Sequence, residues 1–96
     1  MAFLDHAVPR VGLTVSGPVR ELSLYFTREV LYSSVQVTSP TGAVIASSKP
    51  INDPSEQSVV SVRFGHALKP GTYLVSWHVV SIYERPTSGT FRFTVS

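Results

Sequence analysis

The sequence predicts an all-β fold, an immunoglobulin-like antiparallel β-sandwich with Greek-key connections and about seven strands. Two observations support this prediction. Short stretches alternate apolar and polar residues, which is the period of a strand that buries one face. Turn residues separate these stretches at even spacing, and no stretch shows the longer period of a helix. The chain has 96 residues, so we expect a single sandwich domain over residues 1–96.

The first third of the chain contains two expected strands. Residues 3–8 form a short strand that Pro9 ends, and residues 12–18 form a loop marked by glycine and proline. Residues 21–27 alternate cleanly, so one face of this strand should lie in the core. The apolar side chains of that face are Leu22, Leu24 and Phe26.

The middle of the chain predicts a hairpin between two less regular segments. We expect residues 28–32 to be a connection that could hold a helical turn. Residues 34–38 and 43–46 form the two arms of a hairpin around the turn at residues 40–42. Residues 47–55 are polar and contain two prolines, so they are expected to form a loop.

The clearest strand signal lies near the C-terminus. Residues 71–81 follow a Pro-Gly turn and alternate with period two, and one face carries the only Trp of the chain. That face should be buried, because Trp77 has more apolar surface to remove from water than any other side chain here. Residues 58–64 form the strand before it, and residues 89–95 close the chain as the last strand.

Composition and charge exclude several classes of function. The chain is 43% hydrophobic and 15% charged, which is enough apolar material for a core and too much for a disordered chain. No apolar run approaches the roughly 20 residues of a membrane span. The formal net charge is +2, and the eight basic residues are scattered rather than clustered. We therefore expect no binding to nucleic acid.

The residues available for chemistry are few. Without cysteine, the chain has no disulfide, no thiolate nucleophile and no cysteine-based zinc site. Ser, His and Asp are present, but no nucleophile elbow, no His-Glu-x-x-His motif and no phosphate-binding glycine loop accompanies them. We therefore expect a protein that is not an enzyme.

Four sequence blocks occur in order along nearly the whole chain. They are HAVPRVG (residues 6–12), LSLYFTREV (22–30), PGTYLVSWHVVS (70–81) and PTSGTFRF (86–93). In this order and spacing they resemble the CopC/PcoC-type periplasmic copper-resistance proteins. The resemblance implies a small Greek-key β-sandwich that binds copper in the periplasm, often beside a membrane copper-transport protein. The native signal peptide would then be absent from this chain.

The resemblance also implies a Cu(II) site. In the family an N-terminal His supplies its amine and imidazole, and an Asp-x-His pair follows the Trp strand. These ligands suit the tetragonal preference of Cu(II). In this chain Met1 stands at the first position, and Tyr83 and Arg85 stand at the positions of the pair. Arg85 cannot act as a ligand and brings a positive charge, so the site is expected to be degenerate.

The metal-ligand candidates that remain are Met1, through its terminal amine, and His6, with Asp5 beside it. The alternative for His6 is a polar strand residue near a sheet edge. His66 is expected in an exposed loop, and His78 on the solvent side of the Trp strand. The family's methionine-rich loop for Cu(I) is missing, since Met1 is the only methionine.

Two functions of different classes follow from these residues. The first is a periplasmic copper-homeostasis protein, a monomeric carrier of copper ions with a weakened Cu(II) site. The second is a protein-interaction module without metal, whose docking surface surrounds Tyr83 and Arg85. For these two residues an ordinary solvated loop is the competing interpretation. A third alternative is an adhesion or scaffold domain that works through an apolar patch or an open strand edge.

Overall fold

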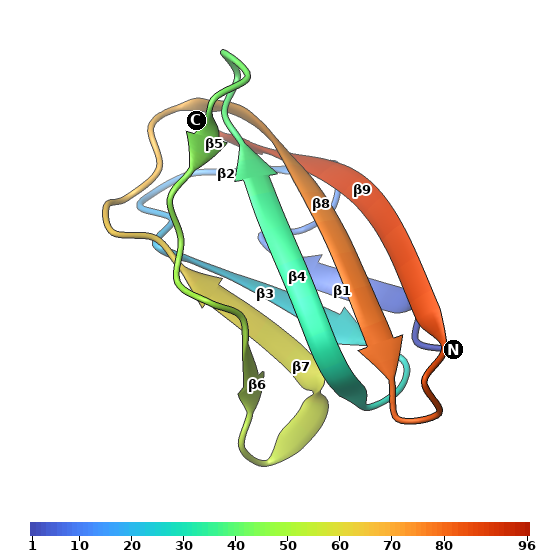
Figure 1. Ribbon diagram of the computed structural model, residues 1–96. Helices are drawn as coiled ribbons and strands as arrows, with labels where there is room; N and C mark the ends of the chain where they lie inside the picture. Colours follow the sequence, from blue (N-terminus) through green and yellow to red (C-terminus); the bar gives the residue numbers. More distant parts are fainter.

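Two β-sheets pack face to face in this structure, a computed structural model that describes residues 1–96 (Figure 1). Nine strands form the sheets, and the structure has no helix of the length and apolar character that a membrane span requires. The strands are β1 (Leu4–Val8), β2 (Thr14–Val15), β3 (Glu21–Phe26), β4 (Val30–Thr38), β5 (Val44–Ile45), β6 (Ile51–Asp53), β7 (Glu56–Arg63), β8 (Gly71–Ser81) and β9 (Pro86–Val95).

The order of the strands confirms the predicted Greek-key sandwich. One sheet has the order β1-β3-β7-β6, and the other has the order β2-β9-β8-β4-β5. The chain crosses repeatedly from one sheet to the other, so β3 pairs with β7 and β4 pairs with β8. The pairings are antiparallel except that of β2 with β9, which is parallel.

The expectation of a helical turn over residues 28–32 is wrong. β4 begins at Val30, whose side chain is 0% exposed and whose backbone is in register with Ser81 of β8. Packing of Val30 in the core decides the local conformation, because tertiary contacts outweigh the weak preference of a short segment. β4 is therefore longer than the hairpin arm predicted at residues 34–38.

Two short strands lie in segments that were expected to be loops, which raises the number of strands from about seven to nine. β2 pairs with the end of β9, and Thr14 faces Thr94 across the two strands. β6 pairs with β7, and Ile51 faces Ser61. Both strands are too short to show an alternating pattern. They form because a neighbouring strand, β9 for β2 and the adjacent β7 for β6, offers unpaired backbone groups beside them.

The core lies between the sheets and is richest around β8. Val75 and Val79 are 0% exposed, and the ring of Trp77 packs edge-on against Phe26 of the facing sheet, with 5.2 Å between ring centroids. The predicted burial of the Trp face is therefore confirmed. Burial of each large apolar side chain contributes on the order of 2 kcal/mol. Gly89 of β9 lies against the Trp77 ring so closely that a Cβ atom there would be 2.6 Å from Cζ2.

The long strands give the molecule two distinct ends. β4 and β8 run antiparallel along the sandwich, so Val30 and Ser81 lie at one end while Thr38 and Gly71 lie toward the other (Figure 1). The first end, which we call the hairpin end, comprises residues 1–3, 27–31 and the β8–β9 loop at residues 82–85. The second, the cavity end, comprises residues 39–46 and 64–73.

Candidate functional site

The β8–β9 loop is a tight turn that presents Tyr83 and Arg85 to solvent. β9 begins at Pro86, earlier than the predicted start at residue 89, so only residues 82–85 connect the two strands. The Glu84 N–H donates to the Ser81 carbonyl at 2.7 Å, and the Ser81 N–H donates to the Arg85 carbonyl at 3.2 Å. Glu84 has φ = 56°, in the left-handed region, which reverses the chain between Tyr83 and Arg85.

The N-terminal segment is held beside this hairpin. The Thr87 hydroxyl at the start of β9 donates a hydrogen bond of 2.5 Å to the carbonyl of Ala2, whose side chain is fully buried. Phe3 and Thr27 exchange two hydrogen bonds, of 3.0 and 2.9 Å. Figure 1 shows the N-terminus next to the start of β9. The structure thus brings the position of Met1 to the hairpin that carries Tyr83 and Arg85.

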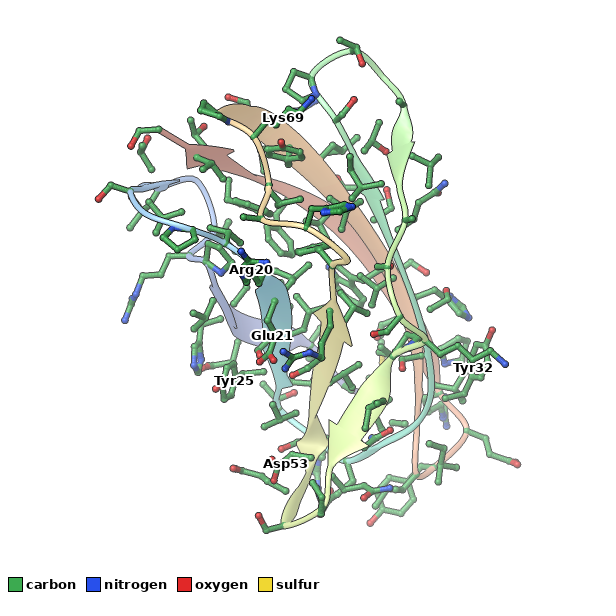
Figure 2. The ribbon with its side chains drawn as sticks, turned by 90° about the vertical axis from the view of Figure 1, so that its left-hand side faces the viewer. Arg20, Glu21, Tyr25, Tyr32, Asp53 and Lys69 are labelled. Carbon is green, nitrogen blue, oxygen red and sulfur yellow. The ribbon has the colours of Figure 1, made fainter.

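His6 lies elsewhere, on the outer face of the sheet formed by β1, β3, β7 and β6. Its ring stacks on Tyr25 of β3, with 4.2 Å between centroids and 10° between planes. Its Nδ1 is 2.7 Å from Oδ2 of Asp5. This arrangement leaves Nε2 as the nitrogen available to a ligand, and the side chain is 44% exposed. Tyr25 and Tyr32 project from opposite sides of the sandwich in Figure 2.

Met1 and His6 therefore occupy different surfaces of the molecule. Met1 precedes the residue that bonds Thr87 of the second sheet, whereas His6 stacks on Tyr25 of the first sheet. No group of three or more His, Asp or Glu side chains converges in a way that could hold a metal ion. The assignment of Met1 and His6 as copper ligands stays a prediction.

The other two histidines lie in two further places. His78 is on the outer face of the second sheet, as predicted, where its Nδ1 is 2.8 Å from the Ser88 hydroxyl oxygen. Its ring meets Tyr32 edge-on at 6.4 Å. His66 lies in the exposed β7–β8 loop, also as predicted, and lines a cavity at the other end of the molecule. The three histidines form no common site.

Two features of the hairpin end were not found from the sequence. The segments that meet there carry exposed apolar side chains, which are Met1, Phe3, Leu31, Ile82 and Tyr83, from 38 to 64% exposed. Beneath them, Ser81 is fully buried and its hydroxyl has no hydrogen-bond partner. The only signal in the sequence was the presence of apolar residues near the ends of expected strands and connections, and this signal does not show that they lie at one end of the molecule.

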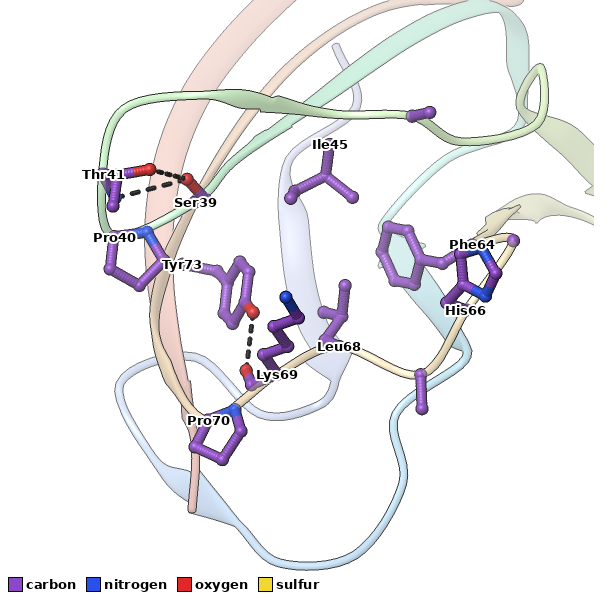
Figure 3. Close-up of a pocket in the computed structure, with 13 residues that line it drawn as sticks. Ser39, Pro40, Thr41, Ile45, Phe64, His66, Leu68, Lys69, Pro70 and Tyr73 are labelled. Atoms are coloured by element: carbon purple, nitrogen blue, oxygen red, sulfur yellow. Dashed lines mark hydrogen bonds between the residues drawn. The ribbon is translucent and has the colours of Figure 1, made fainter.

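The cavity end was also not found from the sequence. A cavity of about 710 Å³ opens between the β4–β5 loop and the β7–β8 loop (Figure 3). Its lining includes Ile45, Phe64, Leu68 and Tyr73, with Lys69 and His66 beside them. The two loops are about 25 residues apart in the sequence, so no local pattern predicts that they form one concave surface.

These observations define a class of protein, a small Greek-key β-sandwich whose N-terminal segment is bonded to the hairpin that follows its Trp strand. The sequence model of one protein family, the CopC domain, matches residues 4–96 of this chain. The chain belongs to this family, and the predicted resemblance is confirmed.

Individual relatives agree with this assignment. Protein YobA of Escherichia coli (strain K12) is 31% identical over 96 residues, which cover 98% of this chain and 77% of YobA. Protein YobA of Shigella flexneri matches to the same extent. Among solved structures, CopC from Methylosinus trichosporium OB3b has a TM-score of 0.90 and 23% identity, and it covers 100% of this chain and 94% of its own. PcoC, a methionine-rich copper resistance protein from Escherichia coli, has a TM-score of 0.87 and 22% identity. The match covers 99% of this chain and 98% of the PcoC chain. These structures share the fold.

Proposed function

We propose that this chain is a periplasmic copper-homeostasis protein of the CopC type with a weakened Cu(II) site at the hairpin end. Membership of the CopC domain family supports the general role. The observation that carries the location is the hydrogen bond between Thr87 and Ala2, which holds the N-terminus beside the β8–β9 loop. These are the two parts of the chain from which the family resemblance builds a copper site.

The residues present at the hairpin end explain why the site would be weak. The terminal amine of Met1 is a nitrogen donor that suits Cu(II). Tyr83 would bind only as the phenolate, and the guanidinium of Arg85 repels a cation and has no lone pair to offer. His6 offers Nε2 from a neighbouring surface, so it would bind with the amine only after the N-terminal segment moves. Weak binding by few ligands follows from this arrangement.

The proposed role is that of a carrier rather than an enzyme. The single domain over residues 1–96 would act as a monomer that takes up a copper ion and passes it on, with a membrane copper-transport protein as partner. An accessible site of few ligands suits such a role, because a carried ion must be released as well as bound.

The test is a titration of Cu(II) followed by calorimetry and electron paramagnetic resonance, on protein whose N-terminus is verified by mass spectrometry. We expect binding of one equivalent with a tetragonal signal from nitrogen ligands. His6→Ala should weaken the binding if His6 supplies Nε2, whereas the matched control His78→Ala, on the other sheet, should leave it unchanged. An absence of binding at metal concentrations well above that of the protein would contradict the proposal.

A second function is favoured by one specific observation, the exposed apolar side chains at the hairpin end. Five such residues, Tyr83 among them, lie in the segments that meet at this end, and apolar side chains exposed close together mark interaction surfaces. In this account the sandwich is a protein-interaction module, and replacement of the copper ligands has left a docking surface around Tyr83 and Arg85. The same titration separates the two functions, because the module predicts no nitrogen-rich copper signal.

A further inference from the structure

The cavity end carries features of a ligand site that are independent of the copper proposal. We propose that the cavity between the β4–β5 and β7–β8 loops binds a small apolar anion, a compact aromatic or aliphatic body with one negatively charged head group. Its volume of about 710 Å³ lies within the range of sites for small molecules, about 300–1,000 Å³. It is also larger than three other hollows on the surface, of about 340, 280 and 210 Å³.

The floor of the cavity is apolar. Phe64, Leu68 and Tyr73 belong to the buried core, and Ile45 is half-buried against it. These four side chains come from three separate parts of the chain, β5, the β7–β8 loop and β8 (Figure 3). Phe64, Leu68 and Tyr73 are only 3–8% exposed, so the apolar surface open to a ligand is a small part of each side chain. An apolar ligand body that covers this surface would gain about 25 cal/mol for each Å² removed from water.

The charges around the cavity select an anion. Lys69 and His66 both line it, and neither side chain makes an ion pair within the chain. None of the six Asp and Glu residues of the chain lies in the lining. In Figure 3 the Lys69 side chain is drawn between those of Tyr73 and Leu68, and Lys69 lines the cavity with them. A ligand with an apolar body could therefore place a sulfonate or carboxylate against Lys69.

The walls of the cavity are fixed in the absence of a ligand. The Tyr73 hydroxyl donates to the Lys69 carbonyl at 2.6 Å, which ties the β7–β8 loop to β8. The Leu68 N–H donates to the Val19 carbonyl at 2.9 Å. On the other side Gly71 touches Pro40 so closely that a Cβ atom would lie 2.5 Å from Cγ. A pre-formed cavity of this kind binds without a large cost of ordering the loops.

The probe for this site is 8-anilinonaphthalene-1-sulfonate, an apolar double ring with a single negative charge. Its fluorescence rises on transfer from water to an apolar site, so a titration of the folded protein gives the dissociation constant. The uncharged N-phenyl-1-naphthylamine, of nearly the same shape, measures the contribution of the negative charge. Heteronuclear NMR shifts of the backbone amides locate each probe on the protein.

We expect saturable binding of the sulfonate, with amide shifts concentrated at residues 39–46 and 64–73. The sulfonate should bind about fivefold more tightly than the neutral probe, as one partly exposed charge contact provides. Lys69→Gln should remove this difference and leave the neutral probe unaffected. The control Lys49→Gln makes the same charge change on an exposed residue outside the cavity, and it should have no effect.

Three results would overturn the proposal. The first is the absence of saturable binding at millimolar probe. The second is a set of amide shifts centred on the hairpin end, which would show that the probe reports the apolar patch around Tyr83. The third is equal affinity of the charged and neutral probes in the unsubstituted protein. Because the Lys69 side chain is exposed, the Lys69→Gln variant is expected to fold normally. None of these three results depends on whether the protein binds copper.

Discussion

The two ends of the sandwich are built from the same strands but are closed in different ways. At the hairpin end, β8 and β9 are joined by a four-residue turn. The Ile82 N–H of this turn donates to the Glu29 carbonyl of the β3–β4 loop, and the Thr87 hydroxyl at the start of β9 donates to the Ala2 carbonyl of the N-terminal segment. Apolar side chains are exposed there. At the cavity end, longer loops stand apart and leave apolar side chains around a hollow of about 710 Å³.

The two ends therefore differ in which property a change of sequence can alter. The hairpin end is held together mainly by backbone groups, so it can keep its shape when the side chains at its tip, such as Tyr83 and Arg85, are changed. The cavity end depends on particular side chains, such as Tyr73 and Pro40, that hold two loops in place. Changes of sequence should therefore alter the chemistry of the first end and the shape of the second.

The largest effect on stability is expected for a change in β9, which packs closely against Trp77 of β8. Gly89→Ala places a methyl group within 3 Å of the Trp77 ring, and overpacking of this kind should destabilise the protein by about 3 kcal/mol. Gly65→Ala, at the cavity end, meets no atom within 4 Å and should change the stability by less than about 1 kcal/mol. Urea denaturation of both variants measures the free energies of unfolding, and similar values for the two would contradict the packing argument.

Restoring the family's copper ligands should have the next largest effect. The double substitution Tyr83→Asp with Arg85→His adds a carboxylate and an imidazole and removes a positive charge at the hairpin tip. We expect the affinity for Cu(II) to rise about a hundredfold, which corresponds to about 2.7 kcal/mol.

A matched control for this change uses the interleaved positions of the same turn. Ile82→Asp with Glu84→His introduces the same two residue types one position out of register, and it should raise the affinity much less. Calorimetric titration of both double variants measures the difference. Equal gains would mean that any added ligand near the turn suffices and that the positions of Tyr83 and Arg85 have no special relation to a copper site.

The smallest effect concerns the wall of the cavity. Tyr73→Phe removes the hydrogen bond from the hydroxyl to the Lys69 carbonyl and should cost about 1 kcal/mol of stability. It should also weaken binding of the sulfonate probe, because the β7–β8 loop loses its attachment to β8. Tyr83→Phe removes a hydroxyl that is exposed and makes no such bond, so thermal and urea unfolding should be unchanged. Identical unfolding of the two variants would show that the Tyr73 bond does not hold the loop.

Much of the fold could be predicted from the sequence, because burial on one face leaves a period of two. The strand around Trp77 was placed at residues 71–81, and β8 spans the same residues. The prediction failed where a strand depends on a distant partner. Thr14 and Val15 pair with the last residues of β9, and Val30 is fixed as strand by the core rather than by its neighbours.

The candidate sites could be predicted less well than the fold. The family resemblance placed the N-terminus and the β8–β9 loop in one copper site, which stays a prediction. The Thr87 hydrogen bond to Ala2 shows only that the N-terminal segment lies beside the start of β9. The alternative given for His6, a polar strand residue near a sheet edge, agrees with its place on the edge strand β1. Its stacking on Tyr25 could not be foreseen, because it depends on how β1 is registered against β3. The cavity could not be foreseen either, since its walls meet only in the folded chain.

The most direct test of copper binding at the hairpin end is a set of heteronuclear NMR spectra recorded with small additions of Cu(II). The unpaired electron of Cu(II) broadens the amide signals of nearby residues, so the loss of signal maps the site without any substitution. We predict selective broadening at Phe3, Tyr83 and Thr87, with His66 and Lys69 of the cavity end unaffected. Broadening centred on His66 or His78 instead, or none at all, would contradict the assignment of copper to the hairpin end.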